Sequence, residues 1–151
     1  MKNNYTMDRI KERQKLSAQG LNYSVQRMDL LIISISGAGV YVCLETLKYI
    51  NDKQMEPSLI IKLAGVILLI AIILNFLSQF FGHRANVNDY LMCDAQLDAG
   101  EKISKKEQLE INNYDCKASF YDKATTYINY SSAIVMSIGL ILLIIYFLIT
   151  F

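Results

Sequence analysis

Glu45 is the residue whose type and position point most directly to chemistry. It follows an uncharged run of 15 residues, Leu30–Leu44. A carboxylate in an apolar helix is costly and usually faces water or a partner. At spacings of three and four, the same side of a helix would carry Ser34, Gly37, Ala38, Tyr41, Glu45 and Lys48. This stripe predicts either a pore lining or contact with an identical helix.

A simpler interpretation of the same stripe stays open. Glu45 would then lie at the outer membrane interface and pair with Lys48 one turn later, because residues three apart are neighbours on a helix. The small residues would only pack on the next helix.

A second polar stripe comprises Asn75, Ser78, Gln79, Gly82, His83 and Asn86. In lipid, these amides and hydroxyls need hydrogen-bond partners on another helix or in water. Two interpretations are equally supported: a water-filled inner vestibule, and hydrogen bonds between helices.

No group of residues suits an enzyme. The chain has one His and lacks a glycine-rich phosphate loop and a nucleophile with a base in a known order. We expect no catalytic residue, no cofactor and no metal site, because His83 has no closely spaced Cys or His partner. Cys43, Cys93 and Cys116 are expected to be free thiols. The net charge of +1 gives no case for nucleic acid as a partner.

Two apolar segments are long enough to cross a bilayer. Leu63–Gly82 is an uncharged stretch of 20 residues, and Ser131–Phe151 is one of 21. A hydrocarbon core takes roughly 20 helical residues. Two such helices leave little soluble core in which to bury the Leu30–Leu44 run, so it is predicted to span as well. The predicted fold is an all-α membrane protein with three transmembrane helices and a long cytoplasmic antiparallel helical hairpin between the second and the third.

The predicted organisation has five parts. They are a basic amphipathic segment at 1–29, transmembrane helices at 30–50, 59–82 and 124–151, and the helical hairpin at 83–123. In the short link Asn51–Ser58, Pro57 is expected in the first turn of the second transmembrane helix.

Charge predicts the orientation. Residues 1–29 carry six Lys or Arg, whereas the link between the first two helices carries only Lys53. Because Lys and Arg favour the inner side, the N-terminus and the hairpin should be cytoplasmic and the C-terminus outside. The basic segment would either only enforce this topology or also attract anionic lipid.

The hairpin is predicted to turn at residues 100–104. Gly100 suits the C-terminal cap of the first arm, and Ser104 with Glu107 forms a capping box at the start of the second. Asp89, Asp94, Asp98 and Glu101 are interpreted as a solvated face, with a docking surface for a basic partner as the alternative.

A heptad seam follows the turn. Its apolar positions are Ile111, Tyr114, Ala118, Tyr121, Thr125 and Ile128, and the register continues through Ser132, Val135, Gly139, Leu142, Tyr146 and Ile149. This coiled-coil spacing predicts one unbroken helix from about Lys105 to the C-terminus. Ser132 and Gly139 favour close helix contact, within one chain or between chains. If the two antiparallel arms of the hairpin are equally long, the inner membrane surface is predicted near Lys123.

The organisation resembles that of SLATT-type proteins, small membrane effectors of bacterial nucleotide-signalled antiviral immunity. The likeness lies in a basic helix with Arg9, Lys11 and Arg13, then a membrane hairpin, then a long helical extension. The resemblance implies an inner-membrane protein of a bacterium that forms homo-oligomers and permeabilises the membrane.

Two functions are carried forward. The first is an oligomeric pore or membrane-disrupting effector, with membrane lipid and further copies of the chain as partners. The second is a membrane-anchored scaffold or accessory subunit whose hairpin docks a cytosolic protein. A secondary transporter is less well supported, because three helices supply neither inverted repeats nor a broken helix.

Overall fold

The chain folds into three helices, α1 (Lys2–Asp52), α2 (Leu59–Ala99) and α3 (Lys105–Thr150), in a computed structural model. The structure describes residues 2–54, 56–99 and 104–150, with side chains from residue 26 on, except at 97–99. Each helix contains a segment long and apolar enough to cross a membrane: Gln26–Asp52, Leu59–Gln96 and Lys105–Thr150. The all-helical fold and its three candidate spans are confirmed.

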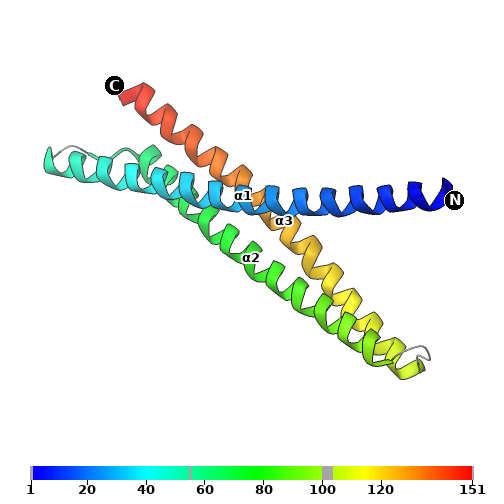
Figure 1. The fold of residues 1–151 in the computed structure, drawn as a ribbon. Helices are drawn as coiled ribbons and strands as arrows, with labels where there is room; N and C mark the ends of the chain where they lie inside the picture. The colour runs from blue at the N-terminus through cyan, green and yellow to red at the C-terminus, as the bar shows by residue number, and fades with distance from the viewer. Residues whose placement is uncertain (1, 55, 100–103, 151) are drawn as a thin grey trace.

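α2 and α3 form a long antiparallel hairpin, and α1 lies across it (Figure 1). The Phe81 and Tyr121 rings are 5.9 Å apart between centroids. A Cβ added to Gly82 would lie 3.5 Å from Cγ2 of Thr125. Gly82 therefore lies opposite Thr125. Equal arm lengths predict that the end of the first arm lies opposite Lys123, which is two residues away. α3 is one helix from Lys105 to Thr150, as the seam predicts.

The link between α1 and α2 is a short turn. The Lys53 amide donates to the Tyr49 carbonyl at 3.1 Å, and Gln54 has a left-handed φ of 54° that ends the helix. The Ile60 amide donates to Oγ of Ser58 at 3.3 Å, so Ser58 caps α2. The expectation for Pro57 is wrong: α2 begins at Leu59, and Pro57 lies one residue before the cap, because the capping oxygen is supplied by Ser58, which follows it.

The second arm of the hairpin begins with the predicted capping box. The Ser104 amide donates to Oε2 of Glu107 at 2.7 Å, and the Glu107 amide donates to Oγ of Ser104 at 3.3 Å. The bond from the Ser104 amide, with a smaller part from the Ser104 side chain, lowers the pKa of the Glu107 carboxyl. Gly100, the predicted cap of the first arm, lies outside the described residues.

The core lies where all three helices meet. Leu68 of α2 is fully buried between glycines of the other two helices. A Cβ added to Gly39 of α1 would lie 2.6 Å from Cδ1 of Leu68, and one added to Gly139 of α3 would lie 2.7 Å from its Cγ. The surrounding cluster contains Cys43, Ile50, Ile61, Ala64, Leu143 and Tyr146. The close contact predicted for Gly139 is thus made within one chain.

Large apolar side chains cover the outside of the bundle. Ile73 and Phe76 of α2 and Ile141 and Leu148 of α3 are each more than half exposed. Such a continuous apolar exterior is unfavourable in water and suits lipid. The surface therefore agrees with the membrane spans inferred from length and composition.

Candidate functional site

Polar residues join α1 to α2 within the bundle. Asn75 is fully buried, and its Nδ2 donates to Oδ1 of Asp29 at 3.0 Å. Gln79 Nε2 donates to Oδ1 of Asn75 at 3.2 Å, so both functions of the Asn75 amide are bonded. For Asn75, the structure agrees with the interpretation of hydrogen bonding between helices.

Ser78 joins α2 to α3 in the same way. Its side chain is 2 % exposed, and its hydroxyl donates to the Thr125 carbonyl at 3.1 Å. Gln79, by contrast, is exposed, and its bond to Asn75 lies within α2. Asn75 and Ser78 thus lie one turn apart and each bonds to a different helix.

The stripe predicted on α1 faces away from the other helices. Ser34, Tyr41, Glu45 and Lys48 are exposed, and a Cβ added to Gly37 would meet nothing within 4 Å. We call these five residues the open face of α1. No ion pair joins Glu45 to Lys48 in the described part of the chain. Glu45 instead lines a shallow groove with Thr46, Tyr49 and Phe147.

A different face of α1 packs against the hairpin. Its buried residues are Ile32, Ser36, Gly39, Cys43 and Ile50. They follow spacings of four, three, four and seven, which is also a heptad pattern. Both faces of α1 therefore carry small residues at helical spacing, and only one of them is used within the chain.

The hairpin seam lies on the partly buried side of α3. Ile111 is 4 % exposed, and Tyr114, Ala118, Tyr121, Thr125 and Ile128 are half-buried. Farther along the same register, Ser132, Gly139 and Tyr146 are buried, whereas Ile149 is 72 % exposed. The seam packs within one chain and ends before the last turn of α3.

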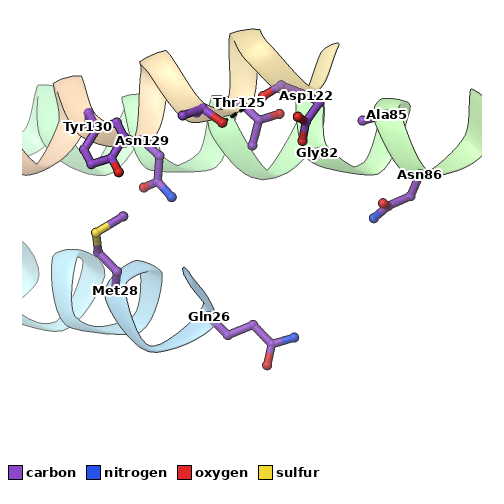
Figure 2. Close-up of a pocket in the computed structure, with 10 residues that line it drawn as sticks. Gln26, Met28, Gly82, Ala85, Asn86, Asp122, Thr125, Asn129 and Tyr130 are labelled. Carbon is purple, nitrogen blue, oxygen red and sulfur yellow. Dashed lines mark hydrogen bonds between the residues drawn. The ribbon is translucent and has the colours of Figure 1, made fainter. Parts of the chain in front are cut away.

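A cavity of about 450 Å³ lies where α1, α2 and α3 approach one another (Figure 2). We call it the three-helix cavity. α1 contributes Gln26 and Met28, and α2 contributes Gly82, Ala85 and Asn86; α3 contributes Asp122, Thr125, Thr126, Asn129 and Tyr130. In Figure 2 the Asn129 amide extends from α3 toward α1, into the space between them.

An acidic groove of about 360 Å³ continues from this cavity between α2 and α3. It shares Ala85, Asn86 and Asp122 with the cavity and adds Asp89, Asp115, Ala118 and Ser119. Small side chains on both helices leave this space open. Of the acidic stretch predicted as a solvated face, Asp89 and Asp94 are both exposed, and Asp89 also lines the groove. The Asp98 side chain and Glu101 lie outside the described residues.

Sequence reasoning missed Asp29, Ser36 and Asn129. Asn129 is 4 % exposed and its Oδ1 accepts no hydrogen bond; Ser36 is fully buried and its hydroxyl has no partner within the described residues. Asn129 directly follows Ile128 of the seam, and Asp29 directly precedes the first apolar run. The sequence signal that could have identified Asn129 and Asp29 is an amide or a carboxylate at the edge of an apolar segment.

The cysteines are free thiols in the structure, with Cys43 buried and Cys93 and Cys116 exposed. In the described part of the chain, no three His, Cys, Asp or Glu side chains lie close enough to hold a metal ion. The chain matches no protein-family profile, and no curated protein or solved structure shows significant similarity to it.

Proposed function

We propose that this protein assembles through the open face of α1 into a pore or membrane-disrupting complex. The observation that carries the proposal is that Glu45 and Lys48, with Ser34 and Tyr41, lie exposed on a helix whose opposite side is packed. Polar groups at membrane depth require water or a partner, and the chain's own helices do not cover this face. Further copies of α1 around a water-filled path would provide both.

The open face also permits close approach of another helix. Gly37 has no atom within 4 Å of its Cβ position. Its spacing of four and eight residues from Tyr41 and Glu45 places it on the same side of the helix. Small residues at a helix surface let two backbones come close together. A ring of Glu45 carboxylates near one mouth of the assembly would favour cations, as acidic rings do in cation channels.

The organisation of the chain supports a proposal for the membrane and the biological process in which this activity takes place. A basic helix, a membrane hairpin and a long helical extension resemble the SLATT-type effectors, which implies a bacterial inner membrane and a role in antiviral defence. In this setting the N-terminus and the tip of the α2–α3 hairpin are cytoplasmic, in agreement with the six Lys and Arg of residues 1–29.

Reversal potentials in planar bilayers under a salt gradient test the proposal. Glu45→Gln should lower cation selectivity while assembly persists, and Glu45→Lys should reverse the preference. Glu56→Gln is the matched control, because Glu56 is an exposed carboxylate in the link at the same end of α1. Equal selectivity in all variants would exclude Glu45 from the conducting path.

Assembly is tested separately with Gly37→Leu. A Cβ added at Gly37 would meet nothing within 4 Å in the single chain, so the variant should fold but assemble less well. Wild-type mass in detergent for this variant would contradict the proposed interface.

A scaffold is the second candidate, and exposed apolar residues on the hairpin favour it. Tyr90, Leu109 and Phe120 are 68 %, 71 % and 65 % exposed on the parts of α2 and α3 beyond the core. A monomeric protein that conducts no ions would support the scaffold and exclude the pore.

A further inference from the structure

A groove on the outside of the bundle lies between α1 and α2, near the link that joins them. It has a volume of about 290 Å³. Its apolar lining includes Val40, Leu44 and Leu47 of α1 and Gly65, Val66 and Leu69 of α2. None of the described residues of α3 lines it. We call it the α1–α2 groove.

The floor of the α1–α2 groove is formed where the two helices come close together. Cys43 is 2 % exposed, and a Cβ added to Gly65 would lie 3.3 Å from Cβ of Cys43. Leu44 and Val66, which also line the groove, are 60 % and 54 % exposed. The groove is therefore closed toward the core and open toward the surroundings of the bundle.

The two ends of the groove differ in polarity. Among the described residues that line it, only Lys62 is charged. Lys62 is exposed and directly precedes the uncharged stretch Leu63–Gly82, so it lies where α2 enters the hydrocarbon layer. From there the groove continues to Leu69, seven residues farther along α2 and about 10 Å deeper. The groove is thus cationic at the membrane surface and apolar below it.

This polarity matches that of a phospholipid, which has an anionic phosphate at the membrane surface and acyl chains in the hydrocarbon layer. A Lys side chain can lay its apolar stem along the groove while its ammonium group reaches the surface. No carboxylate lines the groove, and Lys62 forms no ion pair within the described residues. A headgroup with a cation of its own, such as choline, would be repelled by Lys62. The charge therefore favours an anionic headgroup.

The size of the groove argues against a helix of another chain as its occupant. A helix with its side chains is about 10 Å across, so a segment about 10 Å long would occupy on the order of 800 Å³. The groove offers about 290 Å³. An extended acyl chain is narrow enough to enter, whereas a helix could only lie over the opening.

We infer that the α1–α2 groove binds one acyl chain of an anionic phospholipid whose phosphate pairs with Lys62. The inference depends on the membrane spans and on a groove within one chain. It therefore holds whether or not the protein assembles through the open face of α1.

Native mass spectrometry of the full-length protein in detergent tests the site. Dioleoylphosphatidylglycerol is compared with dioleoylphosphatidylcholine, because the two lipids have the same acyl chains and differ in the net charge of the headgroup. One phosphatidylglycerol should be retained per chain, with an affinity about fivefold higher than that of phosphatidylcholine, as expected for one Lys beside an anionic headgroup. Equal affinity for the two lipids would overturn the inference.

Substitutions of Lys62 test the role of its charge. Lys62→Met keeps an unbranched side chain without the charge and should remove the preference for phosphatidylglycerol, whereas Lys62→Arg should keep it. Lys53→Met is the matched control, because Lys53 is an exposed Lys of the link that lies outside the groove, and it should keep the preference as well. An equal loss in Lys62→Met and Lys53→Met would overturn the inference, because the lipid would then respond only to overall charge.

A phosphatidylglycerol with a photoreactive diazirine in one acyl chain locates the chain. Adducts should form on Leu44 and Val66, and an excess of unlabelled phosphatidylglycerol should suppress them. Ile141 is the control, because it is 55 % exposed on α3, close to the value for Val66, and lies outside the groove. Its adducts should be suppressed less strongly. Equal suppression at all three positions would overturn the inference, because lipid would then cover the bundle without preference.

Discussion

The side chain of Leu68 occupies the space where a Cβ of Gly139 would lie, with Cγ only 2.7 Å from that position. On its other side, Cδ1 of Leu68 is 2.6 Å from the corresponding position at Gly39. Leu68 cannot move away from one glycine without approaching the other. This contact fixes how closely α1 and α3 can approach α2.

Gly139→Ala and Gly39→Ala should therefore each destabilise the bundle. Overpacking costs about 1–3 kcal/mol, against a gain of about 1 kcal/mol in helix propensity. Gly82→Ala is the control, because it gains the same propensity while its Cβ would meet Thr125 only at an ordinary contact distance of 3.5 Å. Relative to this control, each core variant should unfold more easily in detergent by about 1–3 kcal/mol. Leu68→Ala should remove the difference in a double-mutant cycle; an unchanged difference would place the strain elsewhere.

Asp29→Ala should loosen α1 from α2. It leaves Nδ2 of the fully buried Asn75 without its acceptor, which costs about 1–3 kcal/mol. Asp94→Ala, at an exposed site on α2, should change the unfolding free energy by less than about 0.5 kcal/mol. Hydrogen exchange near residues 29–36 should rise in Asp29→Ala alone, and equal exchange in both variants would show that the bond contributes little.

The start of α3 should depend on pH. The pKa of the Glu107 carboxyl is lowered in the folded state, so its stabilisation is complete above the ordinary Glu range and is lost as pH falls through the lowered pKa. Backbone chemical shifts of Ser104 and Glu107 should report this loss. Glu107→Gln should keep the cap, since Gln also completes a capping box, but remove the pH dependence. Glu110→Gln, one turn later, should titrate like wild type in this region.

Thiol labelling tests the proposed orientation. Cys93 and Cys116 are exposed and should react with an impermeant maleimide only after the cells are permeabilised. Cys43 is buried and should resist labelling under both conditions until the protein is unfolded. Rapid labelling of Cys93 or Cys116 in intact cells would place the hairpin on the outer side.

The helices could be predicted from the sequence because each depends on features of neighbouring residues. Apolar runs of membrane length predict the spans, and Ser104 with Glu107 predicts the start of α3. The packed face of α1 was not predictable in the same way, because Gly37 and Gly39 mark opposite faces with the same residue type. Only the fit of Leu68 against both Gly39 and Gly139 decides between them, and this contact joins residues far apart in sequence.

The candidate site was predicted in part. Asn75 and Ser78 were recognised as polar groups in need of partners, but sequence spacing cannot show that the partners are Asp29 and the Thr125 carbonyl. Asn129 was overlooked because the seam assigns Ile128, its neighbour, to the packed side. Where three helices meet, two adjacent positions can both face inward, which a two-helix heptad does not anticipate.

The unbroken course of α3 also has a mechanical consequence. Its 46 residues form a rod about 70 Å long from the tip of the hairpin to the far end of the bundle. Within that rod, no loop separates the part beside the acidic groove from the part that holds Gly139 against Leu68. A displacement along the rod axis at Lys105 would therefore reach Tyr146 with little loss, whereas a hinged connection would absorb it.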